Sequence, residues 1–391
     1  MKILYITYEN VYRTGILQAM VVKPLAIMHQ KYGVEFTIIS TIKESEDDEI
    51  YFENKNLTSR KYPYLKIIEF KKGLGKSQSI FSFLKDILPI FLCSLRIGRE
   101  VDLIHCRSYG AALIGLLVKI ILRKKFIFDM RGVLPEETVE LGKLNYNSPK
   151  YRLLKFIEKI LIRKADYVFV VSNKFKDYLK DNFKYNQVIN VNNPTDFNDY
   201  GGIKQYDCIN FIYSGSLQKW HLPEKTILYY SLLSKIYKEH IHLYFCTNDI
   251  DKAKRYFEDG SIDPRYYTLQ SVPFEKMPYF YAKSHIGFCF INESFSKSVC
   301  FPVKFSEYIA SNIYVLANKN IGDLKEIISK YDCGLVFNDL ENIETNLAQI
   351  DSLVSRLIRE KVNFDRNRID FLDWNVIGTE NIYKIYEKLC S

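Results

Sequence analysis

Lys304 and Glu307 are the residues whose types and spacing point most directly to chemistry. They stand three positions apart in the segment 301–310, where Pro302 suits the entrance of a helix and the residues from Tyr308 onward turn apolar. At this spacing both side chains share one face of a helix. A cation there would bind a phosphate, and a carboxylate would bind a ribose diol. The alternative is an ordinary ion pair on a surface helix.

A second candidate is the turn that follows the apolar run 210–214. Gly215 and Ser216 come directly after this run, and Lys219 comes shortly after them. A glycine lets the backbone approach a ligand closely, and exposed N–H groups with a lysine complement a diphosphate. A plain tight turn is the alternative. Gly15 follows the first strand candidate in the same way, and neither turn has the G-x-G-x-x-G spacing of a nicotinamide dinucleotide site.

Polar side chains also stand at the carboxyl ends of two apolar runs in the first half of the chain. Asp129 and Arg131 fall at the carboxyl end of one run, and His105 and Arg107 leave the preceding run at the same level. Parallel sheets present functional side chains at that edge. We therefore expect this group to orient an acceptor hydroxyl, with a purely structural Asp–Arg pair as an equal alternative.

The sequence favours no metal site. Asp249 opens a D-x-D pair of the kind that some metal-dependent sugar transferases use, but Asp249 as the N-cap of a helix over 252–257 is a simpler account. His240 and His242 lack further ligands at metal spacing. His221 follows Trp220 and could approach a ligand in the cleft, but the preferred interpretation is a satisfied surface histidine. We expect neither a metal nor a cofactor.

The elements that position these groups alternate between short apolar runs and longer amphipathic ones, and the series occurs twice. This pattern is typical of strands and helices around parallel sheets. In the first half the strand candidates are 3–8, 34–40, 65–70, 103–106, 126–130, 167–171 and 188–191. In the second half they are 210–214, 242–246, 267–270, 286–291, 314–317 and 335–337. We expect an α/β protein with two doubly wound, Rossmann-like domains that face a cleft.

A polar connection separates the two halves near residues 192–207. It places the first domain at 1–195 and the second at 196–375, with a final amphipathic segment at 376–391. With 391 residues, of which 47% are hydrophobic, the chain can bury two cores.

Composition narrows the choice of partners and compartment. The net charge of +9 favours anionic partners, but no nucleic-acid motif is present. The 8 cysteines form no C-x-x-C pair, which indicates reduced thiols and a cytoplasmic location. Two basic amphipathic stretches, 116–125 and 151–164, favour either contact with anionic lipid at the inner face of the cell membrane or simple packing on a sheet. No run reaches the length of a spanning helix, and because the chain starts with a strand-like run we expect no secretory signal.

Taken together, these segments resemble family 4 of the retaining GT-B glycosyltransferases, which build bacterial surface polysaccharides. The resemblance spans essentially the whole chain. Its most specific parts are Gly215-Ser216-Leu217 with Lys219, and Pro302-x-Lys304-x-x-Glu307-Tyr308 followed by Gly322-Asp323.

The resemblance implies a role for each of these groups. Glu307 would bind the donor ribose, while Lys219 and Lys304 would bind the diphosphate. The backbone near Val272 and Phe274 would bind the base. Asp129 and Arg131 resemble an acceptor-side loop, so the expected catalytic set is Asp129, Arg131, Lys219 and Glu307. The final segment would return to the first domain.

Two departures from the family pattern stand out. The family carries a glutamate eight positions before Glu307, where this chain has Val299. Asn292, Glu293 and Ser294 lie nearby as candidates to substitute for it. The first-domain glycine loop contains Gly15 alone.

The expected reaction moves a sugar from a nucleotide sugar to a saccharide or a lipid-linked glycan, in the synthesis of capsule, O-antigen or another surface polysaccharide. One alternative is a sugar-nucleotide 2-epimerase of the same fold. Another is a non-catalytic partner of a polysaccharide or a membrane, for which Val299 is the motivating observation.

Overall fold

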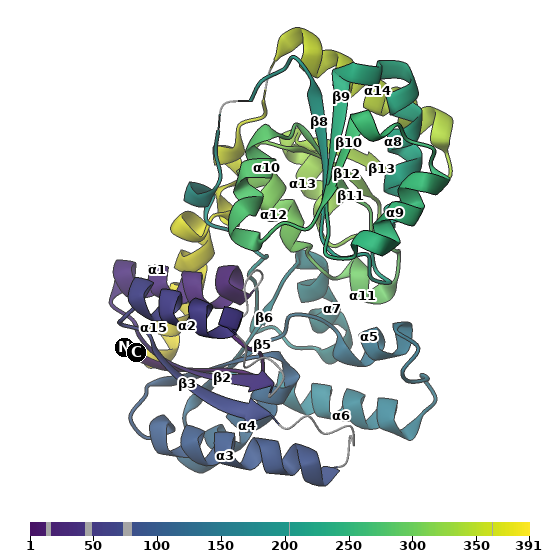
Figure 1. The fold of residues 1–391 in the computed structure, drawn as a ribbon. Helices are drawn as coiled ribbons and strands as arrows, with labels where there is room; N and C mark the ends of the chain where they lie inside the picture. The colour runs from purple at the N-terminus through teal and green to yellow at the C-terminus, as the bar shows by residue number, and fades with distance from the viewer. Residues whose placement is uncertain (13–16, 44–48, 73–79, 203, 362) are drawn as a thin grey trace. The chain divides into compact units, whose positions relative to one another are not determined.

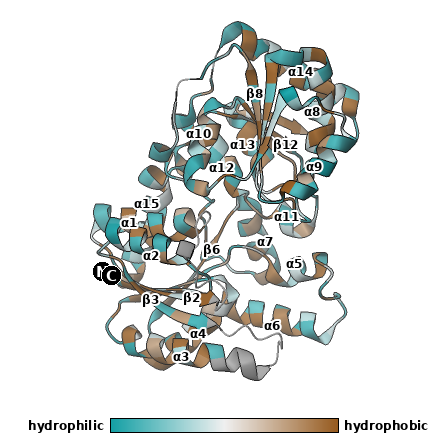
Figure 2. Cartoon of the chain, in the orientation of Figure 1, coloured by the Kyte–Doolittle hydropathy of each residue, from teal (hydrophilic) through white to brown (hydrophobic). Residues whose placement is uncertain are grey.

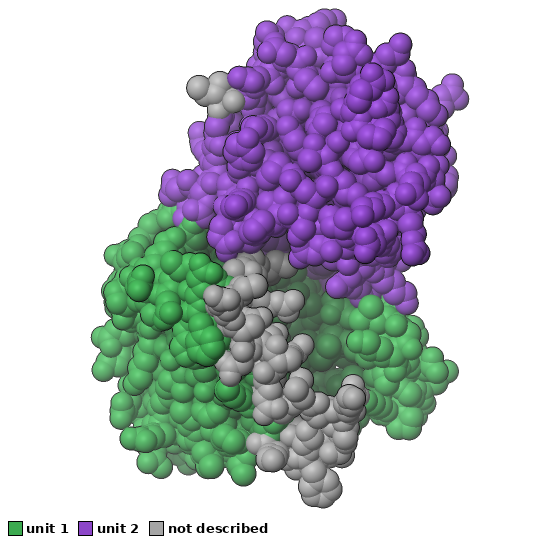
Figure 3. Space-filling view, in the orientation of Figure 1, with its two compact units in different colours: residues 1–192, 374–391 green, residues 193–373 purple. Residues whose placement is uncertain are grey.

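The computed structural model describes residues 1–391 apart from 13–16, 44–48, 73–79, 203 and 362. The chain divides into two compact units (Figure 3). Unit 1 contains Met1–Asn192 and Trp374–Ser391, and unit 2 contains Asn193–Asp373. The domain boundaries expected from the sequence, after residues 195 and 375, lie close to the observed boundaries after Asn192 and Asp373. Gly15 lies outside the described residues, so its predicted donor contact remains a prediction.

Unit 1 is built on a seven-stranded sheet with the strand order β3-β2-β1-β4-β5-β6-β7, and its neighbouring strands are parallel (Figure 1). The strands are β1 (Lys2–Thr7), β2 (Glu35–Lys43), β3 (Lys66–Lys72), β4 (Leu103–Arg107), β5 (Lys125–Asp129), β6 (Tyr167–Val170) and β7 (Val188–Asn190). The α-helices are α1 (Lys23–Tyr32), α2 (Glu49–Lys61), α3 (Ile80–Gly98), α4 (Ser108–Leu122), α5 (Leu134–Glu140), α6 (Pro149–Lys164), α7 (Asn173–Phe183) and α15 (Thr379–Cys390).

Local sequence explains how the helices of unit 1 are placed. The helix α1 ends at Gly33, whose φ of 67° lies in the left-handed region that glycine adopts at least cost. Gly115 lets α4 lie close to the sheet, since a Cβ there would come 2.3 Å from the sulfur of Cys106. The helix α6 begins at Pro149, and the Ser148 hydroxyl accepts a hydrogen bond from the Tyr151 N–H as its N-cap. The last helix, α15, packs on α1 and β4, so the C-terminal segment of the chain belongs to unit 1.

Unit 2 repeats the same topology in a six-stranded sheet with the order β10-β9-β8-β11-β12-β13. Its strands are β8 (Ile209–Ser214), β9 (Ile241–Cys246), β10 (Tyr267–Gln270), β11 (Ile286–Cys289), β12 (Tyr314–Asn318) and β13 (Gly334–Phe337). Its α-helices are α8 (Pro223–Tyr237), α9 (Ile250–Asp259), α10 (Met277–Lys283), α11 (Phe295–Ser298), α12 (Val303–Ala310), α13 (Leu324–Tyr331) and α14 (Ile343–Glu360).

Both units are therefore doubly wound α/β sheets, which confirms the predicted fold class. The strand order reverses between β1 and β4 in unit 1 and between β8 and β11 in unit 2. Open parallel sheets bind ligands outside the carboxyl ends of the strands at this reversal. The residues that follow β4 and β8 are thus expected to contribute to ligand binding. Among the described helices, none is long and apolar enough to cross a membrane.

Candidate active site

The turn after β8 and the helix α12 form the centre of the candidate donor site in unit 2. Gly215 follows the strand with a φ of 128°, a conformation that side chains rarely adopt. Lys304 is only 8% exposed, and a Cβ added to Gly215 would lie 3.6 Å from the Lys304 Nζ. The ammonium group therefore lies directly against the backbone of this turn, where glycine leaves room beside it.

The Lys304 ammonium has no hydrogen-bond acceptor among the described residues, although its Nζ is buried. The Lys304 Nζ makes a cation–π contact with the ring of Tyr213, whose centre lies 4.5 Å away. Burial lowers the pKa of Lys304, while Cys289 and Glu307 act in the opposite direction. An unpaired buried cation is costly, so this position suits an anionic ligand that supplies the missing acceptor.

Glu307 lies one turn further along α12 and is 6% exposed. The Tyr281 hydroxyl donates to the Glu307 Oε2 at 2.9 Å and lies 3.0 Å from the hydroxyl of Ser214 at the end of β8. Burial raises the pKa of Glu307, and the hydrogen bond from Tyr281 and the charge of Lys304 reduce this rise. The carboxylate is thus held at the carboxyl end of β8 by neighbours from two other elements.

These contacts decide between the two interpretations of the Lys304 and Glu307 spacing. Both side chains are buried, and the lysine donates no hydrogen bond to any residue that the structure describes. The ordinary surface ion pair is therefore the wrong interpretation. A helix that buries a cation without an acceptor beside a glycine turn has the properties of a ligand site.

The turn itself is held by three side chains. The Asp249 carboxylate accepts a hydrogen bond from the Leu217 N–H at 2.7 Å, and the Lys252 Nζ donates to the Leu217 carbonyl at 2.6 Å. The Tyr213 hydroxyl donates to the carbonyl of Ser216 at 3.0 Å. Asp249 does occupy the N-cap position of α9, but its side chain makes no cap hydrogen bond. The predicted capping role is corrected: the carboxylate fixes the turn after β8 instead.

The environment of His221 is not that of the satisfied surface histidine that the sequence favours. Its backbone bridges to Ile291 beyond β11, which places it at the reversal of strand order in unit 2. The Nδ1 atom is buried and has no hydrogen-bond partner among the described residues. The charge of Lys304, followed by burial and the charge of Lys297, lowers the pKa of His221 to about 3. The ring is therefore neutral at physiological pH and has a free nitrogen.

The other predicted donor residues follow strands of unit 2 at the same edge of the sheet. Lys219 lies exposed in the turn before α8. Val272 and Phe274 follow β10 and are half-buried. Glu293 is exposed, and its carboxylate accepts a hydrogen bond from the amide of Asn320 at 2.9 Å.

Val299, which stands where the family pattern has a glutamate, directly follows α11 and is 3% exposed. The side chain at this position is packed away from solvent. A carboxylate contact from position 299 is thus replaced here by an apolar contact inside the protein.

In unit 1 the candidate acceptor residues form a buried charge cluster at the ends of β4 and β5. Asp129 is 4% exposed, and its two carboxylate oxygens face three partners: Arg131 at 3.2 Å, Arg107 at 3.5 Å and His105 at 3.8 Å. Arg107 also donates to Glu9, at 3.1 Å, in the segment after β1. Burial alone would raise the pKa of Asp129, but Arg131, His105 and Arg107 hold it well below its usual range.

This arrangement makes Asp129 an orienting group more than a proton acceptor. Its carboxylate is ionised and already engaged, so it fixes the guanidinium groups of Arg131 and Arg107 at the carboxyl edge of the sheet. Arg131 is the member of this cluster that is partly exposed, with 16% of its side chain accessible. A ligand would therefore meet Arg131 first.

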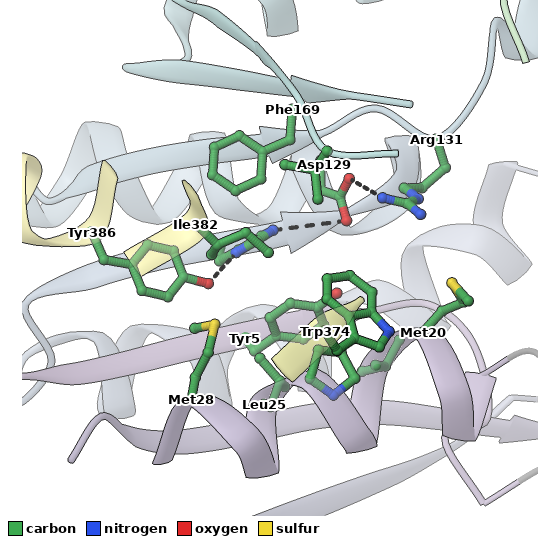
Figure 4. Close-up of a pocket in the computed structure, with 14 residues that line it drawn as sticks. Tyr5, Met20, Leu25, Met28, Asp129, Arg131, Phe169, Trp374, Ile382 and Tyr386 are labelled. Atoms are coloured by element: carbon green, nitrogen blue, oxygen red, sulfur yellow. Dashed lines mark hydrogen bonds and ion pairs between the residues drawn. The ribbon is translucent and has the colours of Figure 1, made fainter. Parts of the chain in front are cut away.

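A small pocket lies beside this cluster (Figure 4). Tyr5, His105, Asp129 and Arg131 line it from the sheet, and Trp374 lines it from the final segment of the chain, together with apolar side chains of α1 and α15. The His105 Nδ1 is hydrogen-bonded to the Tyr386 hydroxyl on α15. The pocket has a volume of about 20 Å³, which is room for a water molecule and too little for a sugar ring. We therefore interpret this pocket as a packing gap beside the charge cluster and not as a binding site for the acceptor.

Among the described residues, no group of three or more histidine, cysteine, aspartate or glutamate side chains is placed to hold a metal ion.

Comparison with known proteins places this geometry in a class. The sucrose-phosphate synthase of Thermosynechococcus elongatus superimposes with a TM-score of 0.71 at 13% identity, covering 100% of this chain and 99% of the other. The Anabaena protein Alr3699/HepE, solved in complex with UDP and glucose, gives 0.68 at 12% identity, over 99% and 100% of the two chains. The lipopolysaccharide outer core galactosyltransferase WaaB gives 0.65 at 14% identity, over 99% and 100%.

UDP-N-acetylglucosamine 2-epimerases share the architecture too. The enzyme of Methanocaldococcus jannaschii gives a TM-score of 0.60 at 12% identity. Identities this low show a common fold, which is the GT-B fold. Among curated proteins, sequence comparison finds no significant match.

Part of the amino-acid sequence also matches a protein family. Residues 19–197 match the model of Glycosyltransferase Family 4. The chain is a glycosyltransferase of the GT-B fold, similar to family 4, as its resemblance to that family predicts.

Three features of the site escaped the sequence analysis. Tyr281 holds Glu307 from α10, the neutral His221 stands beside the Lys304 charge, and Asp249 secures the turn after β8. The only signal for Tyr281 was its place in an aromatic run before β11, which many core tyrosines share.

Proposed function

We propose that unit 2 binds the donor, a nucleotide sugar, with the diphosphate at the Gly215 turn and the ribose at Glu307. The observation that carries this proposal is the buried Lys304 ammonium, which lies against Gly215 and has no acceptor in the described part of the chain. A diphosphate oxygen would supply that acceptor. The carboxylate of Glu307, already fixed by Tyr281, would accept hydrogen bonds from the ribose hydroxyls.

Lys219, which is exposed, is proposed to close on the diphosphate from the solvent side. The backbone near Val272 and Phe274 is proposed to contact the base, since both residues follow the edge strand β10. Glu293 is proposed to contact the sugar in place of a carboxylate at position 299. The HepE structure contains UDP and glucose, so uridine diphosphate is the first nucleotide to test.

We propose that transfer proceeds with retention and without a metal. The bond from the anomeric carbon to the diphosphate breaks, and the diphosphate leaves with an added negative charge. Lys304, Lys219 and backbone N–H groups would stabilise that charge, each charge-assisted hydrogen bond contributing about 1.5–3 kcal/mol. The acceptor hydroxyl attacks the same face of the sugar and gives its proton to the leaving phosphate oxygen, so no protein nucleophile is needed. Insensitivity of the rate to a chelator would support the absence of a metal.

Unit 1 is proposed to bind the acceptor, a saccharide or a lipid-linked glycan of a bacterial surface polysaccharide. Arg131 would contact the acceptor, and Asp129 would position Arg131. WaaB, which shares the fold, is named for its action on the lipopolysaccharide outer core and supports this acceptor class. We also propose that the chain works at the cytoplasmic face of the cell membrane, in contact with anionic lipid.

The test is a thermal-shift screen with the diphosphates of uridine, guanosine, cytidine and adenosine, followed by transfer assays with the matching nucleotide sugars. Binding raises the unfolding temperature by mass action. One nucleotide should stabilise the protein, and Lys304→Ala should remove that stabilisation. Equal stabilisation of the wild type and Lys304→Ala would contradict the assignment.

The main alternative is a 2-epimerase, because solved 2-epimerases share the fold. Incubation with a nucleotide sugar alone separates the two activities. Conversion to the epimer without release of the nucleotide would favour the epimerase, whereas product formation only with an acceptor would favour transfer. A binding protein without turnover would release no nucleotide under either condition.

A further inference from the structure

Large apolar side chains stand exposed on three helices of unit 1. Between 46% and 64% of each residue is accessible to solvent. The residues are Leu88 and Leu92 on α3, Leu117, Ile120 and Ile121 on α4, and Leu153 and Phe156 on α6. Single exposed apolar residues are common on soluble proteins, but a contiguous group marks an interaction surface.

The three helices are neighbours in one layer of unit 1. A Cβ added to Gly98 at the end of α3 would come 2.8 Å from Leu122 and 3.1 Å from Val118, so the ends of α3 and α4 touch. The Lys119 Nζ of α4 donates to the carbonyl of Lys164 at the end of α6 at 2.8 Å. Figure 2 shows apolar segments on all three helices. We call this surface the α3–α4–α6 face.

Positive charge accompanies these apolar side chains. The helices α4 and α6, with the three residues after α4, contain one acidic residue, Glu158. Glu158 is buried and hydrogen-bonded to Tyr109 and Lys155, so it contributes no exposed negative charge. The exposed cations of these helices and the turn after α4 are Arg123, Lys150, Arg152, Lys159, Arg163 and Lys164. Lys125, the first residue of β5, is exposed too, but it lies 3.7 Å from the Asp166 carboxylate.

Apolar groups and cations alternate along the same helices. Ile120 and Ile121 are followed by Arg123 within one turn, and Phe156 lies between Arg152 and Lys159. This is the composition of a surface that rests in the headgroup region of a bilayer, with apolar side chains among the acyl chains and cations on the lipid phosphates.

We infer that the α3–α4–α6 face docks on the surface of an anionic bilayer. The inference rests on the proposed membrane contact and identifies where it is made, and it does not depend on the transfer chemistry. A second copy of the chain fits this face poorly. A symmetric dimer would set the same cations of both copies against each other, with no exposed acid on α4 or α6 to pair them.

The inference is tested by sedimenting the full chain with two kinds of vesicle, one of phosphatidylcholine alone and one containing phosphatidylglycerol. The wild type should bind the anionic vesicles, and salt should weaken this binding. The triple variant Ile120→Ser, Ile121→Ser, Phe156→Ser should bind about a thousandfold less, because each of the three apolar side chains in the lipid contributes about tenfold. Arg123→Ala and Lys159→Ala should each lower binding by about fivefold.

Matched controls come from unit 2. Ile236 on α8 is 57% exposed, as Ile121 is, so Ile236→Ser removes the same kind of side chain away from the face. Lys254→Ala removes an exposed cation of α9. Neither control should change vesicle binding. Circular dichroism and thermal unfolding establish that each variant is folded.

Three outcomes would overturn the inference. They are equal binding to both kinds of vesicle, vesicle binding that the face variants leave unchanged, and a wild-type dimer that the face variants convert to monomers. Nucleotide release from the donor with a water-soluble acceptor is measured in parallel. Loss of vesicle binding with retained release separates the docking surface from the active site, and failure of release in the wild type bears on the proposed function alone.

Discussion

Lys304→Met tests the donor site in two properties at once. In the free protein the Lys304 ammonium is buried without an acceptor, which costs about 1–3 kcal/mol. Its position over the Tyr213 ring returns about 0.5–2 kcal/mol. The two effects nearly cancel, so methionine should leave the free energy of unfolding unchanged or raise it by about 1 kcal/mol.

The same substitution should weaken nucleotide binding strongly. A charge-assisted hydrogen bond to a diphosphate oxygen contributes about 1.5–3 kcal/mol, so the dissociation constant should rise about 10- to 150-fold. Isothermal titration calorimetry with the nucleoside diphosphate from the screen measures the affinity. Thermal unfolding without ligand measures the stability, where 1 kcal/mol corresponds to roughly 2–4 °C.

Lys204 provides a matched control in the same unit. Its Nζ donates to the carbonyls of Ser284 and Asn312, which precede β11 and β12 at the opposite edge of the sheet. Lys204→Met leaves both carbonyls without their donor and should lower the free energy of unfolding by about 1–3 kcal/mol, with nucleotide affinity unchanged. If Lys304→Met instead behaves like this control, losing stability while its affinity for the nucleotide stays within twofold, Lys304 is not the diphosphate ligand.

Three further predictions concern the neighbours of this lysine and the cluster in unit 1. Glu307→Gln should weaken the nucleoside diphosphate about 10- to 150-fold and leave inorganic pyrophosphate unaffected, as calorimetry with both ligands will show; equal losses would argue against a ribose contact. The His221 ring should stay neutral in an NMR titration until about pH 3, and a bound diphosphate should raise the pKa of His221 by offsetting the Lys304 charge. In the unfolded chain the same ring is protonated already near the ordinary histidine pKa. The free energy of unfolding should therefore fall as the pH drops from that value towards 3. Asp129→Asn should cost about 3–5 kcal/mol in denaturant unfolding near neutral pH, since it removes the carboxylate that Arg131 and Arg107 share. Because the pKa of Asp129 is lowered, its contribution to stability is present above the ordinary aspartate value and is lost as the pH falls through the folded-state pKa. A variant as stable as the wild type would show that the pair is not structural.

Much of the fold could be predicted because buried parallel strands are nearly continuous apolar runs. Each strand candidate corresponds to an observed strand, and most boundaries differ by one or two residues. The candidate 286–291 was too long, because β11 ends at Cys289 and the next two residues leave the sheet. There Ile291 bridges to His221, a pairing between segments far apart in the sequence that no local pattern encodes.

The site was predictable in its residue types and not in their environment. Helical spacing placed Lys304 and Glu307 on one face of α12, but periodicity does not say that this face is buried. Burial depends on the close approach of α12 to Gly215 and on Tyr281 from α10, which are tertiary contacts. The same limit explains the errors at His221 and Asp249, since both were judged by their sequence neighbours alone.

The position of a bound diphosphate shows whether Lys304 is its ligand. A crystal structure with the nucleoside diphosphate that stabilises the protein best should show a phosphate oxygen within about 3.2 Å of the Lys304 Nζ, beside Gly215, with the ribose hydroxyls on Glu307. A diphosphate bound elsewhere, with the Lys304 ammonium still lacking an acceptor, would contradict the account.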